Sequence, residues 1–310
     1  MWRKFRFQWL KYFSLLTVAF AVVSCATYQS KISHSRELLK KGQFEEALPE
    51  LEKLAANPGK DQLVYLLDYA TALQVSGRYQ ESANAFNKAD KLVDLNDYHS
   101  VTNVVQATLG GEESIQYKGE SYEKFLINTL NAINYVMLNQ LDDALVEARR
   151  INEKISKMQM DGRSPYEQSP FARYLAGVLW EAQGKYDDAY IEYEASYDLD
   201  GTNPLLPNDL LRMSQKSRRN EAFLKWKKEF PNIKPASPND KSNGEVVFII
   251  QQGWGPEKHT RHSYRFPELY AVRSQTTSVS IQISGFEKER SENIYSIERV
   301  AIDTLEKDFG

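Results

Sequence analysis

The chain of 310 residues has a single cysteine, Cys25. One cysteine excludes an intramolecular disulfide, a CxxC redox pair and a cysteine-rich zinc site. An excess of one charge is also lacking, because 39 Lys and Arg stand against 42 Asp and Glu, for a net charge of -3. This balance gives no electrostatic reason to expect nucleic acid as a partner. With 15 glycines and 11 prolines, the composition is that of a folded chain of one or two domains.

Sequence signatures of catalysis are absent as well. The chain has no GxSxG elbow, no Walker loop, no HExxH and no GxGxxG after a predicted strand. Paired carboxylates occur at Asp142-Asp143 and Asp187-Asp188, but they stand at predicted helix starts, where the helix dipole accounts for them. We therefore expect no enzymatic activity, no cofactor and no metal. Motifs alone do not exclude a glycan hydrolase that uses two separated carboxylates, because the spacing of these groups is set by the fold.

The N-terminal segment has the features of a secretory signal. Residues 1–11 carry four basic residues and no acid, and an apolar stretch follows over 12–23. As a helix this stretch would span roughly 18 Å, which is too short for a bilayer crossing of about 20 residues.

The end of that segment, Val22-Val23-Ser24-Cys25, resembles the bacterial lipobox, in which cleavage before the cysteine leaves it as the lipidated N-terminus. We interpret Cys25 as the lipidation site; the alternative is an ordinary signal peptide cleaved elsewhere. The resemblance implies three acyl chains, more than stable anchoring requires. Ala26 in place of Asp is similar to lipoproteins sorted to the outer membrane, so we expect a bacterial outer-membrane protein, anchored by lipid and facing the periplasm.

One short pattern recurs four times along the body of the chain. Its copies are Gly42-Gln-Phe-Glu-Glu-Ala47, Gly77-Arg-Tyr-Gln-Glu-Ser82, Asn139-Gln-Leu-Asp-Asp-Ala144 and Gly184-Lys-Tyr-Asp-Asp-Ala189. The pattern resembles the turn and second-helix start of the tetratricopeptide (TPR) hairpin. Gly or Asn ends the first helix in a left-handed conformation, the aromatic or Leu fills the angle between the helices, and Ala permits close contact. In the fourth copy, Gly177 is the expected small contact residue of the first helix.

These copies predict a mainly α fold, an irregular TPR-like helical-hairpin array followed by a small α+β region. Turn spacings of 35, 62 and 45 residues place extra residues near 96–120 and 155–170, where Gly and Pro interrupt the helical periodicity. The predicted domains are a lipoprotein signal peptide (1–24), the repeat domain (25–230), a linker with three prolines (231–244) and the small C-terminal region (245–310).

The C-terminal region has fewer signals. Val246–Ile250 predicts a buried strand, alternation at Val279, Ile281 and Ile283 predicts a strand with one wet face, and residues 296–309 predict a helix. Roughly 65 residues of this kind make a marginal core, so the region either packs on the array or is cut before its natural end. Trp254, between two glycines, either forms an exposed contact or folds back onto the small sheet.

Two segments carry a further resemblance. Gly119-Glu-Ser-Tyr122-Glu123 and Val146-Glu147-Ala-Arg149-Arg150-Ile-Asn152 are similar to segments of a largely uncharacterised family of TPR-containing bacterial outer-membrane lipoproteins. The resemblance extends over most of the chain. It implies a location and a fold but no reaction and no catalytic residue, and it favours truncation of the C-terminal region.

Charged residues within these segments admit two interpretations. Glu123, Glu147, Arg149 and Arg150 could form an ion-pair network between two helices. Alternatively, Arg149 and Arg150 with Tyr122 bind a partner's carboxylate or a glycan phosphate. Adjacent helical residues point about 100° apart, so at most one of the two arginines faces such a site fully.

The expected function follows from the shape of a helical array. Stacked hairpins generate an extended concave surface that binds peptides or proteins. We expect a lipid-anchored periplasmic scaffold that binds an unidentified protein partner in cell-envelope assembly, with Tyr122, Arg149, Arg150 and Trp254 as candidate contacts. The alternative is a regulator that contacts peptidoglycan or an exported polysaccharide, with Trp254 as a stacking platform.

Overall fold

The computed structural model describes residues 28–110, 117–160, 169–234 and 246–255, and shorter stretches at 257–260, 267–270, 272, 278–285, 288–291 and 296. The signal-like segment, Cys25 and most of the predicted linker lie outside the described residues, so the domain boundaries stay predictions. The described part contains ten α-helices and four short strands. The prediction of a mainly α fold with a small strand-containing C-terminal region is confirmed.

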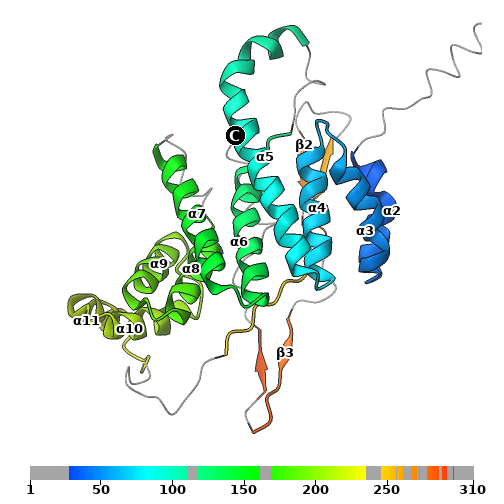
Figure 1. Ribbon diagram of the computed structural model, residues 1–310. Helices are drawn as coiled ribbons and strands as arrows, with labels where there is room; N and C mark the ends of the chain where they lie inside the picture. Colours follow the sequence, from blue (N-terminus) through cyan, green and yellow to red (C-terminus); the bar gives the residue numbers. More distant parts are fainter. Residues whose placement is uncertain are drawn as a thin grey trace, which may run out of the picture.

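The ten helices form five consecutive hairpins, and each helix packs on the next (Figure 1). The hairpins are α2 (Tyr28–Lys40) with α3 (Phe44–Ala56), α4 (Gln62–Val75) with α5 (Tyr79–Gly110), α6 (Ser121–Met137) with α7 (Leu141–Met160), α8 (Pro170–Ala182) with α9 (Tyr186–Leu199), and α10 (Leu206–Lys216) with α11 (Asn220–Glu229). Because the chain alternates direction from helix to helix, the five tight turns lie along one edge of the array, which we call the turn edge.

All five turns have the same backbone geometry. Their left-handed residues are Gly42, Gly77, Asn139, Gly184 and Arg218, with φ of 74, 76, 57, 71 and 60°. In each turn the N–H of this residue donates to the carbonyl three positions earlier, and the next N–H donates to the carbonyl five positions earlier. This is the Schellman arrangement, which satisfies the last carbonyls of a helix. The four predicted turns are therefore confirmed.

The fifth turn, at Arg218, is not predicted by the repeated pattern. It follows Gly184 by 34 residues, but Arg218 stands in place of the glycine, Asn220 in place of the aromatic residue and Phe223 in place of the alanine. All three positions that define the repeated pattern in the other four turns therefore hold a different type of residue here, while the hydrogen-bond pattern of the turn is retained.

The fifth turn provides a first prediction. An L-residue with positive φ is disfavoured by about 1–2 kcal/mol, and the exposed Arg218 side chain offers no packing to offset this cost. Arg218→Gly should therefore raise the free energy of unfolding in urea by about 0.5–1 kcal/mol, since added chain entropy offsets part of the gain. Gly184→Ala is the matched control and should lower it, because nothing lies within 4 Å of the new Cβ and only backbone strain changes. A destabilised Arg218→Gly protein would contradict this reasoning.

The predicted interruptions at Gly110 and Gly119 do fall between helices, because α5 ends at Gly110 and Gly119, with φ of 80°, precedes α6; those at Gly162 and Pro165 lie outside the described residues. α5 continues for 32 residues to Gly110, and α7 continues for 20 residues to Met160, so the extra residues lengthen the second helices. Pro170 does not break a helix but begins α8, where its missing N–H costs nothing. The Ser169 hydroxyl accepts a hydrogen bond from the Ala172 N–H at 3.1 Å and caps that helix.

The core is continuous along the array. One cluster of buried side chains joins the first two hairpins and a second joins the last three, and Leu130 of α6 packs against both. The prediction for Gly177 is confirmed: a Cβ at this position would lie 2.5 Å from the Tyr193 ring of α9. Only a glycine allows α8 and α9 to approach this closely.

The C-terminal region differs from its prediction. Val246–Ile250 belongs to no strand or helix, and its five side chains are 37–68% exposed rather than buried. The described strands form two antiparallel pairs, β1 (Glu257–Thr260) with β2 (Pro267–Tyr270) and β3 (Ser280–Ile281) with β4 (Glu289–Arg290). The predicted alternating strand is thus reduced to the two residues of β3, and the predicted helix over 296–309 lies outside the described residues except for Ser296. β-branched composition favours extended backbone, but burial requires a second layer.

Candidate recognition surface on the first helices

The shared turn geometry places equivalent residues of the five hairpins in register. The residues two positions before each left-handed residue are Lys40, Val75, Met137, Ala182 and Lys216. The residues one helical turn earlier are Arg36, Thr71, Ile133, Val178 and Arg212. Positions i and i+4 lie on one helix face, so these ten residues form a stripe across the first helices. The first-helix stripe has a basic pair in each terminal hairpin and mostly apolar residues in the three central ones.

The centre of the stripe exposes apolar side chains. Val75 is 44% exposed and Met137 is 54% exposed. The ends of α4 and α6 are tied together, because Gln74 Nε2 donates to Asn134 Oδ1 and to the Leu130 carbonyl, both at 2.8 Å. Val75 and Met137 therefore stand at the ends of two helices that are joined directly by hydrogen bonds.

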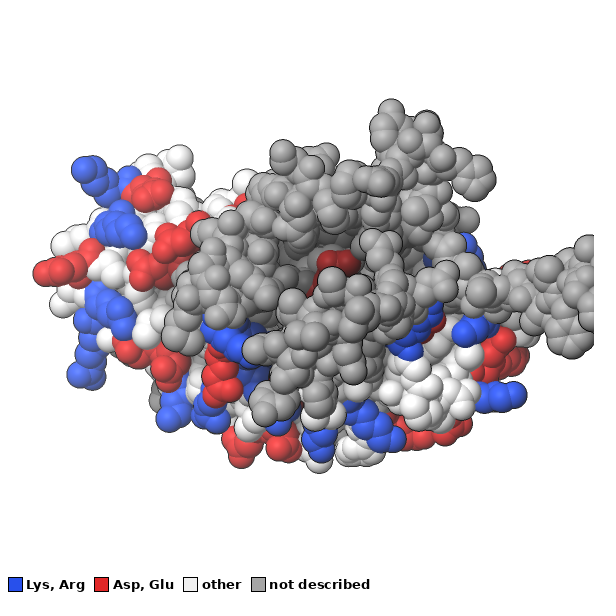
Figure 2. Space-filling view, turned by 90° about the horizontal axis from the view of Figure 1, so that it is seen from above, with Lys and Arg blue, Asp and Glu red and all other residues white. Residues whose placement is uncertain are grey.

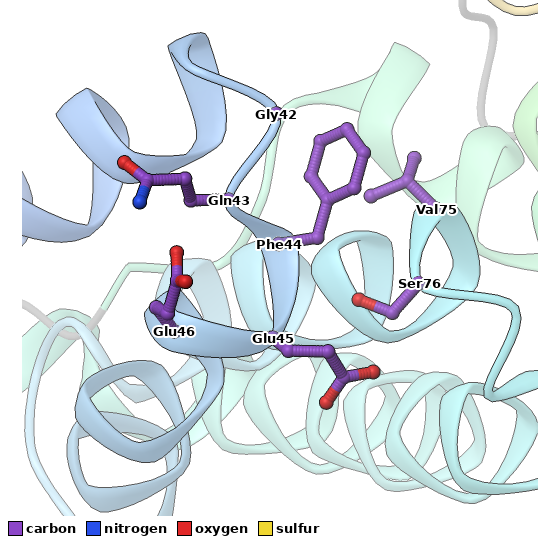
Figure 3. A pocket seen from close by; sticks show the side chains of 7 residues that line it. All are labelled: Gly42, Gln43, Phe44, Glu45, Glu46, Val75 and Ser76. Carbon is purple, nitrogen blue, oxygen red and sulfur yellow. The ribbon is translucent and has the colours of Figure 1, made fainter.

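A pocket adjoins Val75 at the turn edge (Figure 3). Its volume is about 310 Å³, and it is lined by Gly42, Gln43, Phe44, Glu45, Glu46, Val75 and Ser76. Figure 3 shows the Phe44 ring beside Val75, while Glu45 and Glu46 point away from them. Glu45 lies 3.5 Å from the Arg78 guanidinium, and Glu46 makes no ion pair among the described residues. The pocket thus offers an apolar wall with an acidic rim.

The two basic ends of the stripe have different surroundings. In the last hairpin, Arg212 pairs with Asp209 at 2.7 Å and with Glu181, and Lys216 lies 3.4 Å from Glu181, so carboxylates of the array balance these charges. In the first hairpin, the Arg36 guanidinium and the Lys40 ammonium lie 5.8 and 5.6 Å from the centre of the Trp254 ring.

Trp254 is half-buried against α2. The sequence leaves two outcomes open for it, an exposed contact or packing on the small sheet, and the structure shows a third. The residue lies on the first-helix stripe, at the opposite end of the array from the hairpin that precedes it in sequence.

The candidates Tyr122, Arg149 and Arg150 do not form one site. Arg150 lies 2.9 Å from Glu147 and 3.8 Å from Asp90, whereas Arg149 is exposed and covers the Trp180 ring at 5.1 Å. The two arginines diverge, as their 100° separation requires. Tyr122 lies in the first turn of α6, and the hydrogen bond and ion pairs of Arg150 and the ring contact of Arg149 do not involve it.

An ion-pair network does exist, with a different membership. Lys154 donates to Asn128 Oδ1 at 2.6 Å and to the Lys124 carbonyl at 3.1 Å, and it pairs with Asp90. Asn128 donates to Glu147 at 2.7 Å, and burial raises the pKa of Glu147. These contacts join α5, α6 and α7 and are internal to the array.

The predicted participation of Glu123 in this network is wrong. Its carboxylate accepts the Glu120 backbone N–H at 2.8 Å and the Tyr117 hydroxyl hydrogen bond. This is a capping box at the start of α6, where a carboxylate satisfies free N–H groups of the helix. Neither ion pair of Arg150 involves it.

The remaining described surface has mixed charge. Figure 2 shows Lys and Arg side chains interspersed with Asp and Glu side chains, with no large area of one sign on the visible described residues. In the same part of the chain, no cluster of His, Cys, Asp and Glu could hold a metal ion. None of the described helices combines the length and apolar character that a membrane crossing requires.

Comparisons with known proteins find similarity in solved structures alone. No protein-family model and no curated protein matches the chain. Residues 41 to the end of MamA from Desulfovibrio magneticus RS-1 match at 18% identity and a TM-score of 0.40, over 64% of this chain and 88% of that one. A putative kinesin light chain of Podospora anserina with TPR-like repeats matches at 16% identity and 0.41, over 66% and 94%. YrrB, described as a TPR protein with an unusual peptide-binding site, matches at 15% identity and 0.40, over 64% and 82%.

Proposed function

We propose that the chain is a non-catalytic scaffold whose first-helix stripe binds an extended segment of a protein partner in cell-envelope assembly. The observation that carries the proposal is the pair of exposed apolar residues Val75 and Met137, together with the Phe44 pocket that Val75 lines. Packed helices are spaced about 8–10 Å apart, and an extended chain advances about 3.3 Å per residue. A bound segment would therefore advance by roughly three residues from one hairpin to the next, so that about every third side chain would contact a new hairpin.

The pocket indicates what such a segment carries. An apolar side chain would contact Phe44 and Val75, and a neighbouring Lys or Arg would meet the exposed Glu46. Clusters of exposed apolar residues with a polar rim are typical of interaction sites, whereas isolated ones need no explanation. The alternative of peptidoglycan or polysaccharide contact through Trp254 gains no support, because Arg36 and Lys40 already engage that ring.

A capture experiment tests the proposal. The full chain, immobilised and incubated with envelope extract, should retain a protein partner that mass spectrometry identifies. Purified peptidoglycan sacculi should not be retained. Binding to sacculi with no protein partner would contradict the scaffold and support the alternative.

The proposed anchor is a lipid on Cys25, at the bacterial outer membrane and on its periplasmic face. Two residues separate Cys25 from the first residue of α2, so lipidation would hold the first hairpin close to the membrane surface. We predict that Cys25→Ala removes the lipid mass from the protein and releases it from the membrane fraction. Ala26→Ser, one position away, is the control and should keep both. Unchanged fractionation of Cys25→Ala with no loss of mass would refute the anchor.

A further inference from the structure

Trp254 makes a contact that its place in the sequence does not explain. It follows the fifth hairpin and the predicted linker, yet its ring lies on the first helix of the first hairpin. Arg36 and Lys40 are one turn apart on α2, and both cationic groups lie within 6 Å of the ring centre, the range in which a cation is attracted to an aromatic face.

The chain around Trp254 is suited to reversible docking. Gly253 has φ of 89°, and a Cβ added to Gly255 would meet no atom within 4 Å. Both residues that flank Trp254 are glycines, so neither has a side chain that would pack and hold the ring in place. The five apolar residues of 246–250 remain 37–68% exposed and provide little additional attachment. Individual cation–π contacts at partly exposed positions are weak, so the contact can exchange.

We propose that Arg36 and Lys40 form an acceptor for an aromatic side chain, that Trp254 occupies it within the same chain, and that a partner segment carrying a Trp or Tyr displaces Trp254. This inference rests on the proposed function for the identity of the competitor, a protein segment. It deepens that function by assigning the first hairpin a preference for an aromatic residue. Trp254 then keeps the end of the first-helix stripe closed until such a segment arrives.

Fluorine NMR of the full chain labelled with 5-fluorotryptophan tests the intrachain contact without any partner. The Trp254 resonance is assigned by its loss in Trp254→Phe. In Arg36→Ala/Lys40→Ala it should move to the position of the urea-unfolded chain, with the docked population reduced about 5- to 30-fold. Lys31→Ala/Lys41→Ala removes the same charge from the first hairpin and should leave it unchanged. An unchanged resonance in the first double variant would overturn the proposal.

A peptide probe tests the acceptor itself. The heptapeptide of residues 251–257, with a fluorophore at its N-terminus, should bind full-length Trp254→Ala at least about 5-fold more tightly than the wild type, because a tethered ligand competes at millimolar effective concentration. Adding Arg36→Ala and Lys40→Ala should abolish this binding. Equal affinity of the wild type and Trp254→Ala would overturn the proposal. Neither experiment involves the captured partner, so their failure would leave the scaffold function standing, and loss of the scaffold function would leave their results interpretable.

Discussion

Replacing Trp226 by alanine is expected to lower the free energy of unfolding by about 3–5 kcal/mol. The side chain is 1% exposed in α11 and closes the core at the end of the array. Its ring stacks on Phe230 at 5.7 Å and meets Tyr197 edge to face at 5.2 Å, and its Nε1–H donates to the Tyr190 hydroxyl at 3.1 Å. Alanine would leave a cavity and would remove the N–H group from which the Tyr190 hydroxyl accepts a hydrogen bond.

The measurement is urea unfolding combined with hydrogen exchange. Because each hairpin of a repeat array contacts mainly its neighbours, protection should be lost first in α10 and α11. Trp226→Phe retains most of the packing and should cost about 1–2 kcal/mol. Leu224→Ala changes a side chain that is 65% exposed two residues away and should stay within about 0.5 kcal/mol of the wild type. A loss below about 1 kcal/mol in Trp226→Ala would show that the fifth hairpin does not depend on this core.

Replacing Arg212 by alanine should have a similarly large effect at pH 8, about 3–5 kcal/mol. Its guanidinium is buried between α8 and α10, where it pairs with Asp209 and Glu181. Tyr174 also donates to Asp209, at 3.0 Å. Without Arg212, a carboxylate whose side chain is 8% exposed would remain charged in the core with no cation beside it.

This loss should depend on pH. Burial raises the pKa of Asp209 to about 6, although Arg212 acts to lower it, so removing Arg212 raises the pKa further. A carboxyl group with a higher pKa in the folded state binds its proton more tightly when folded, and the native state gains stability as pH falls toward the unfolded pKa near 3.8. The deficit of Arg212→Ala should therefore shrink between pH 8 and pH 5.

The matched control is Arg212→Ala/Asp209→Asn, which removes the cation together with the charge it balances. The free energy of unfolding of this double variant at pH 8 should exceed that of Arg212→Ala. The difference between these two free energies should shrink as pH falls. Equal destabilisation of Arg212→Ala at pH 5 and pH 8 would contradict the assignment of the cost to a charged Asp209.

The turns show what local sequence predicts well. A glycine or asparagine in the left-handed position, an aromatic residue or Leu and a small residue occur within six positions, and four turns follow from them. The fifth depends on the core around Trp226, which draws on α9 as well as α11. Arg218 adopts a positive φ there because tertiary packing outweighs the backbone preference of one residue. The local sequence does not show whether tertiary packing or the backbone preference of a residue determines the conformation.

Non-local pairing explains the other differences. Val246–Ile250 has strand composition, but a strand needs a partner, and the described pairs form elsewhere. The sequence correctly predicts Glu147 in a network with Arg150, which is three residues away, whereas Asp90 and Asn128 join it from other helices. The first-helix stripe is not predicted for a related reason. The correspondence between its residues in the five hairpins becomes apparent only when all five turns are aligned.

The most direct measurement of the central claim is the affinity of the captured partner for stripe variants of the full chain. Val75→Asp/Met137→Asp places two charges on the exposed first-helix residues and should raise Kd at least about 10-fold. Val146→Asp/Ile191→Asp makes the same change on α7 and α9, where the side chains are 39% and 45% exposed, and should leave Kd within about 2-fold of the wild type. If the second pair weakens binding and the first does not, the partner binds the second helices and the proposed recognition surface is wrong.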